Sequence, residues 1–209
     1  MNSRWNWAEK REKKAFLALE DGTVLGGYSV GAPVDATGEV VFNTGMAGYQ
    51  EILSDPSYSG QFVTMTYPEI GSIGINLEDM ESRQFFANGF VMHALNEPSN
   101  WRCEESLAAC LARRGIPAIA GVDTRALTAR LREKGTLKGF LSVTGRVGRD
   151  EGVRMAKAWE GLDGQDYASK VSCDKPYAWD KDGKLSTSWG FPDKLSPVDM
   201  KVVAYDFGI

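Results

Sequence analysis

The cysteines and histidines that could form a nucleophile–base pair are few. The chain has three cysteines, Cys103, Cys110 and Cys173, and one histidine, His93. A catalytic cysteine needs a base beside it, and the sequence shows no nucleophile–base pair. The cysteines have neither C-x-x-C spacing nor a histidine cluster nearby, which excludes the common zinc motifs. We therefore expect no catalytic residue and no metal site, with Cys110 in a helix core and His93 in a strand.

The segment 38–58 carries the polar residues that best suit ligand binding. Glycine and hydroxyl residues there would leave backbone amides and hydroxyl groups accessible. Such groups suit an uncharged or zwitterionic ligand, or the surface of a closely packed partner domain. Turns of this composition are more often structural than functional, so both interpretations stay open at this point. The residues concerned are Thr44, Gly45, Gly48 and Ser57, together with Ser59 directly after the segment.

The elements that must position these residues begin with a β-hairpin. Asp21-Gly22 favours a tight turn between two short apolar segments. Further along, Asp55-Pro56 breaks a segment that can form one or two helical turns. The expected elements are strands at 15–20, 23–26, 40–43 and 62–67, and helical turns within 46–53.

From Gly89 the pattern changes to strands that alternate with helices. Asp123 or Thr124 can cap the amino end of one helix, and Gly135 can end it. This alternation favours a parallel sheet covered by helices, so we predict one mixed α/β domain with an antiparallel start. The expected strands are 89–95, 116–122 and 137–143, and the expected helices are 124–134, 150–160 and one that contains Leu107, Cys110 and Leu111 and ends at Gly115.

The composition is that of an ordinary globular protein. With 209 residues, of which 43% are hydrophobic, the chain can bury one sizeable core. A net charge of -4 provides no general attraction to nucleic acid or anionic lipid. No apolar run approaches the roughly 20 residues that span a bilayer. We therefore expect no nucleic-acid partner, no membrane partner and a cytoplasmic location.

We divide the chain into four parts. Residues 1–14 are a polar tail, and 15–173 form the domain. Residues 174–200 are a linker that could form a hairpin around Asp182-Gly183. Residues 201–209 are an apolar strand with Gly208 close behind it, which is typical of the opening strand of an α/β domain. A lone strand leaves backbone groups unpaired, so we expect further chain to follow it normally.

Several segments, taken together, resemble one known family. From about residue 15 to 209 they are similar to the N-terminal part of the small chain of glutamine-dependent carbamoyl-phosphate synthetase. Several long motifs in the right order are far more specific than any single one. The segments are 39–58, Thr66-Tyr67-Pro68, Ser99-Asn100-Trp101-Arg102, Gly115-Ile116-Pro117, 121–128, 131–135 and 202–208.

The resemblance implies a fold and an activity. Residues 15–173 would form a three-layer β/β/α swivelling domain, and 201–209 the first strand of a class I glutamine amidotransferase domain. In the family, the small chain supplies ammonia from glutamine to a large chain, which uses ATP and magnesium to make carbamoyl phosphate for pyrimidine and arginine biosynthesis. The family's nucleophile lies in Gly-x-Cys-x-Gly and its base in His-x-Glu. Neither pattern occurs here, since Ala94-Leu95 follow His93.

The resemblance therefore implies that this chain docks the amidotransferase domain and the large chain. It also implies that this chain carries no catalytic triad and binds no cofactor. Ser57, in Asp-Pro-Ser-Tyr, would contact glutamine held by the following amidotransferase domain. One hydrogen bond contributes only about 1 kcal/mol, so we expect this contact to matter only in the complete subunit. Asp123 and Arg125 are interpreted as a helix cap and its first turn. A self-standing binding module and an enzyme of unrecognised chemistry remain as alternatives, the enzyme less favoured because a nucleophile–base pair is missing.

Overall fold

The computed structural model describes residues 11–179 and 200–208, and nine strands form within them. Seven of these strands close into a barrel in the order β1-β2-β8-β6-β4-β3-β9, with β9 pairing back to β1. The two short strands β5 and β7 form a separate parallel pair. The strands are β1 (Lys14–Leu19), β2 (Val24–Ser29), β3 (Ala36–Asn43), β4 (Gln61–Met65), β5 (Glu69–Ile70), β6 (Gly89–Val91), β7 (Ala94–Leu95), β8 (Ala118–Ala120) and β9 (Leu137–Ser142).

The barrel combines parallel and antiparallel pairs. Strands β3, β4, β6 and β8 are parallel neighbours, whereas β1, β2 and β9 complete the ring through antiparallel pairs. Glu39 of β3 lies opposite Gln61 of β4, and Phe62 lies opposite Gly89 of β6. Because parallel strands end at the same rim, the loops that follow β3, β4, β6 and β8 leave from one end of the barrel.

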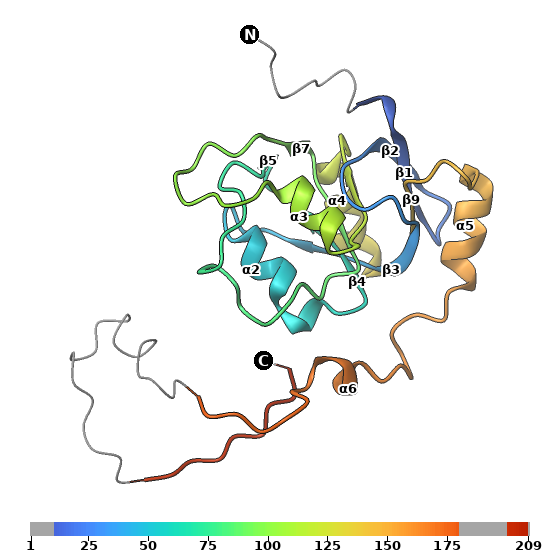
Figure 1. The fold of residues 1–209 in the computed structure, drawn as a ribbon. Helices are drawn as coiled ribbons and strands as arrows, with labels where there is room; N and C mark the ends of the chain where they lie inside the picture. Colours follow the sequence, from blue (N-terminus) through green and yellow to red (C-terminus); the bar gives the residue numbers. More distant parts are fainter. Residues whose placement is uncertain (1–10, 180–199, 209) are drawn as a thin grey trace.

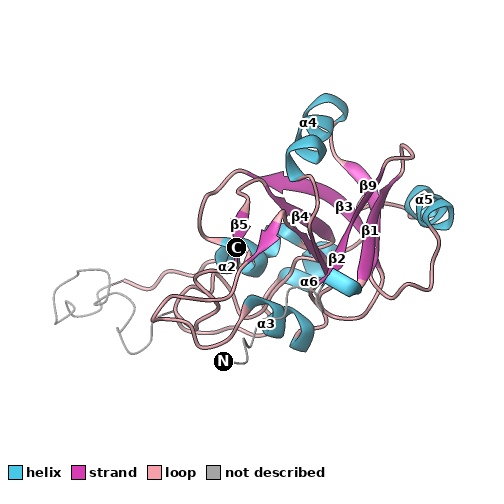
Figure 2. Cartoon of the chain, turned by 90° about the horizontal axis from the view of Figure 1, so that it is seen from above, coloured by secondary structure: helices cyan, strands magenta, loops and turns pink. Residues whose placement is uncertain are grey.

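Helices pack around the barrel. Figure 1 shows α2 and α3 on one side and α5 on the other, and Figure 2 shows α4 beside β9 and β3. Leu53 of α2 and Leu107 of α3 join Val63 and Phe90 in one buried cluster. The helices are α2 (Tyr49–Ser54), the 3-10 turn η1 (Pro56–Tyr58), α3 (Leu107–Arg113), α4 (Thr124–Lys134), α5 (Arg149–Ala158) and α6 (Tyr167–Val171).

A second buried cluster fills the barrel itself. Leu17, Val40 and Phe62 point inward from three strands, and Leu127 and Leu131 of α4 pack against them. The four-residue spacing of these leucines places both on one helical face, as the sequence predicts. The barrel interior and the space under α2 and α3 are therefore two separate apolar layers that share the same strands.

Capping residues begin and end the helices where the sequence predicts. Asp123 Oδ1 accepts a hydrogen bond of 2.9 Å from the Ala126 amide, which confirms it as the N-cap of α4. Gly135 follows α4 with a φ of 85°, and Gly115 follows α3 with a φ of 75°. Glycine adopts this left-handed conformation without the steric cost that other residues meet.

The predicted strand over 89–95 is wrong in its extent. The chain instead forms β6, leaves the barrel at Met92 and His93, and forms β7 beside β5. Met92 donates its amide to the Ile119 carbonyl, after which Ala94 donates to the Pro68 carbonyl. Between residues 92 and 94 the backbone changes its pairing partner from the β8 side to the β5 side. A continuous run of hydrophobic residues does not show where such a change occurs. Helix α6 was not predicted either, because its five residues are too short for a periodic pattern.

The carboxyl-terminal segment differs from the expected strand at 201–209. Residues 200–208 carry no strand, and Val202, Val203 and Tyr205 are all more than 80% exposed. A strand needs a neighbouring strand for its backbone hydrogen bonds, and residues 200–208 pair with no strand in the described part of the chain. The predicted hairpin around Asp182-Gly183 lies outside the described residues.

The mixed α/β class is confirmed by this arrangement. The strand pairing describes a closed barrel, and the three-layer arrangement implied by the resemblance stays a prediction. Within residues 11–179 and 200–208, no helix has the length and apolar character needed to cross a membrane.

Candidate functional site

Ser57 lies on the 3-10 turn η1, directly after α2. Asp55 caps this turn, since its Oδ1 accepts a hydrogen bond of 2.8 Å from the Ser57 amide. Pro56 is buried beneath the turn. The Ser57 side chain is exposed, and its hydroxyl makes no hydrogen bond to another described residue. The turn therefore fixes the backbone of Ser57 while leaving its hydroxyl open for an outside partner.

A hydrogen-bond network joins this turn to the loop after β3. Asn43 Nδ2 donates to the Tyr58 hydroxyl at 3.0 Å, and Asn43 Oδ1 accepts from the Gly45 amide at 2.7 Å. One asparagine therefore links the Thr44–Gly45 loop to the residue that follows Ser57. The structure brings the Thr44–Gly45 loop and the Ser57 turn together, and Asn43, which sequence reasoning missed, links the two.

Helix α2 is tied in turn to the loop over 71–86. The buried Gln50 donates its side-chain amide to the Asn76 carbonyl and accepts from the Asn76 amide at 3.0 Å. The Tyr49 hydroxyl donates to the Gly74 carbonyl at 2.7 Å. Burial raises the pKa of Tyr49, so its hydroxyl stays protonated and remains a donor. The scaffold behind Ser57 is thus held by buried hydrogen bonds.

An ion-paired cluster connects the 71–86 loop to the 97–105 loop. Arg102 lies 2.5 Å from Asp79 and 3.0 Å from Glu78. Asn76 Nδ2 also donates to Asp79 at 2.8 Å, and this bond, together with Arg102, lowers the pKa of Asp79. Arg102 of the Ser-Asn-Trp-Arg segment therefore links the two loops through its ion pairs, whereas the neighbouring Trp101 is 90% exposed.

The cysteines and the histidine do not form a catalytic pair among the described residues. Cys110 is fully buried on α3, where burial raises the pKa of its thiol and disfavours the reactive thiolate. Cys103 Sγ faces the Glu105 carbonyl at 3.3 Å. His93 is exposed, and its Nδ1 lies 3.0 Å from the Val122 carbonyl. No group of three or more metal-ligating side chains occurs within residues 11–179 and 200–208.

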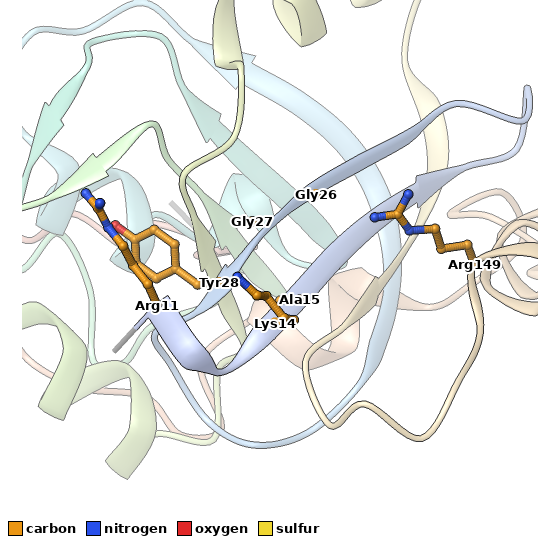
Figure 3. Close-up of a pocket in the computed structure, with 7 residues that line it drawn as sticks. All are labelled: Arg11, Lys14, Ala15, Gly26, Gly27, Tyr28 and Arg149. Atoms are coloured by element: carbon orange, nitrogen blue, oxygen red, sulfur yellow. The ribbon is translucent and has the colours of Figure 1, made fainter. Parts of the chain in front are cut away.

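A pocket of about 440 Å³ lies elsewhere, beside the β1–β2 hairpin (Figure 3). Arg11, Lys14 and Arg149 line it, and Arg11 lies next to Tyr28. Burial raises the pKa of Tyr28, and the nearby Arg11 opposes this shift. The lining is cationic and contains no cysteine, serine or threonine. The sequence does not indicate this pocket, because Arg11 and Lys14 fall in the predicted polar tail and Arg149 is far away in sequence. Ser57 does not line it.

Comparison with known proteins identifies the relatives of this chain. The family model described as "Carbamoyl-phosphate synthase small chain, CPSase domain" matches residues 17–141. The chloroplastic carbamoyl phosphate synthase small chain of Oryza sativa subsp. japonica is 50% identical over 93% of this chain, and that of Arabidopsis thaliana is 47% identical over 93%. The small chain of Photorhabdus laumondii is 47% identical over 94%.

This chain spans about half the length of the curated relatives it matches: 43% of the rice protein, 45% of the Arabidopsis protein and 51% of the Photorhabdus protein. A solved aminopeptidase from Aneurinibacillus sp. strain AM-1 shares 14% identity at a TM-score of 0.36, covering 63% of this chain and 30% of its own, and carries no argument about fold or function. The family match covers most of the barrel and the turn that holds Ser57. The chain therefore belongs to the carbamoyl-phosphate synthase small chain family.

Proposed function

We propose that residues 1–209 serve as the N-terminal domain of a glutamine-dependent carbamoyl-phosphate synthase small chain. In this role Ser57 completes the glutamine pocket of an amidotransferase domain, which releases ammonia. A large chain then uses this ammonia, with ATP and magnesium, to make carbamoyl phosphate. The proposal rests on one observation above all: the Ser57 hydroxyl is exposed and has no partner among residues 11–179 and 200–208, on a turn whose backbone is fixed.

The chemistry of hydrolysis is assigned to the amidotransferase domain rather than to residues 1–209. The ring Nδ1 of the single histidine donates to the Val122 carbonyl, and burial of the Cys110 thiol disfavours formation of its thiolate. A hydroxyl such as that of Ser57 can donate to the glutamine carboxylate and accept from a neighbouring amide. Residues 1–209 therefore contribute binding and orientation, and this chain alone is expected to be inactive.

Exposed apolar side chains support a docking role in the same proposal. Met46, Leu77 and Trp101 lie on three loops and are all at least 75% exposed. Large apolar side chains that remain in solvent are typical of interaction surfaces when they gather on one face. We assign this docking role to contacts with the amidotransferase domain and the large chain.

Several finer features belong to the proposal as well. They are the three-layer β/β/α swivelling arrangement of 15–173, the identification of 201–209 as the first strand of the amidotransferase domain, and a cytoplasmic location. The apolar side chains of Val202, Val203 and Tyr205 support the assignment of 201–209 as a first strand, because such side chains are usually covered when they belong to a sheet.

Calorimetry tests the proposal with the 209-residue chain and the large chain. We expect association with the large chain, no tight binding of glutamine by the chain alone and no ammonia release. A folded sample that fails to bind the large chain would contradict the docking role. Tight glutamine binding would instead favour the self-standing module, and measurable ammonia release would favour an enzyme.

A further inference from the structure

Arg83 holds the carboxyl end of α6 across a long sequence separation. Its guanidinium donates to three backbone carbonyls, those of Lys170, Val171 and Ser172, at 3.2 to 3.3 Å. The last carbonyls of a helix have no partner within the helix, so a planar guanidinium can satisfy several at once. Arg83 therefore fixes the direction in which the chain leaves α6.

The segment that includes α6 is seated directly behind the Ser57 turn. Gly60 follows this turn with a φ of 84°, and a Cβ there would lie 2.6 Å from Leu162 and from Tyr167. Only a residue without a side chain permits this close approach. The amino end of α6 thus lies against the backbone three residues after Ser57.

Residues 206–208 contact the same helix from its other end. A Cβ on Gly208 would overlap the side chain of Val171, and Asp206 Oδ2 accepts a hydrogen bond of 3.2 Å from the Tyr177 hydroxyl. Figure 1 shows the returning segment, coloured red, ending close to α6. One short helix therefore touches both the Ser57 turn and the segment with which the proposed amidotransferase domain begins.

We infer that α6 is a spacer between Ser57 and residues 206–208, and that Arg83 is a positioning residue for glutamine bound between them. This inference rests on the proposed function, since it assumes that glutamine lies between Ser57 and the amidotransferase domain. A donor that must meet a ligand held by another domain needs a fixed distance to that domain. Arg83 fixes this distance by holding α6, the helix that contacts both Gly60 after the Ser57 turn and Gly208. Arg83 itself touches no substrate in this proposal.

The test compares Arg83→Gln with wild type in the complete small chain assembled with the large chain. We expect KM for glutamine to rise about threefold to tenfold, the range of one lost positioning contact, while synthesis from free ammonia is unchanged. Arg83→Lys keeps the charge without the planar fork and should give an intermediate value. Arg113→Gln is the matched control, because Arg113 is an exposed, ion-paired arginine on α3.

A second measurement uses amide hydrogen exchange in the 209-residue chain. Arg83→Gln should raise exchange within α6, and Arg113→Gln should not. Unchanged exchange in α6 would overturn the clamp itself. An unchanged KM for glutamine, or equal losses with glutamine and with ammonia, would overturn the positioning role. If the wild-type assembly does not use glutamine at all, the proposed function fails, and the exchange result still decides whether Arg83 locks α6.

Discussion

Replacing Ser57 by alanine separates ligand binding from folding. The hydrogen bond that caps η1 is accepted by Asp55 from the Ser57 backbone amide, so it survives the substitution. The side chain is exposed, and its hydroxyl has no partner among the described residues. We therefore expect the free energy of unfolding to change by less than about 0.5 kcal/mol.

The effect on glutamine follows from the value of one hydrogen bond. A neutral bond contributes about 1 kcal/mol, and a bond to a charged carboxylate about 1.5 to 3 kcal/mol. At about 1.4 kcal/mol for each factor of ten, Ser57→Ala should raise KM for glutamine by roughly fivefold to a hundredfold. Synthesis from free ammonia should keep its wild-type rate, because that reaction bypasses the glutamine pocket.

The assay is steady-state synthesis of carbamoyl phosphate by the assembled small and large chains, with glutamine or ammonia as nitrogen donor. Ser59→Ala is the control, since Ser59 is half-buried and follows the same turn. A KM for glutamine within twofold of wild type in Ser57→Ala would refute the assignment of Ser57 to the pocket. Loss of activity with both donors would show that the turn supports assembly instead.

Three further changes test how the scaffold is held. Gly60→Ala combines a positive φ with a clash against α6 and should cost about 2 kcal/mol or more in urea unfolding, whereas Gly22→Ala, with nothing within 4 Å, should cost less. Asp123→Ala removes the N-cap of α4 and should cost about 1 kcal/mol by the same measurement, and Glu133→Ala should not. Asp79 has a pKa below its usual 3.8, so its stabilisation is present above about pH 4 and is lost as pH falls through the lower folded-state pKa. Asp79→Asn should therefore flatten the fall in stability below about pH 4, and an unchanged slope would contradict this role.

Local signals predicted most of the elements correctly. The hairpin at Asp21-Gly22, the N-cap at Asp123 and the glycine stops at Gly115 and Gly135 depend on neighbouring residues alone. Those preferences act over a few positions, so they can be seen in the sequence. The family motif indicates Ser57, and its hydroxyl has no hydrogen-bond partner in the part of the chain that the structure describes.

Long-range partners could not be predicted in the same way. Strand β9 pairs with both β1 and β3 and thereby closes the barrel, although 97 to 126 residues separate the paired residues in sequence. The bonds from Asn43 to Tyr58 and from Arg83 to α6 also depend on the folded chain. An exposed arginine in a loop has no local feature that distinguishes a clamp from a solvated side chain.

The ties around Ser57 explain how a single hydroxyl could influence glutamine binding. Fixing the backbone of one mobile residue costs about 1 to 2 kcal/mol, which would cancel the contribution of one hydrogen bond. Here the turn is already fixed by the Asp55 cap, by the bond from Asn43 to Tyr58 and by the contact of Gly60 with α6. The ordering cost is met during folding, so the bond can contribute to binding. It follows that loosening any one of these ties should weaken glutamine binding even though the Ser57 hydroxyl is left in place.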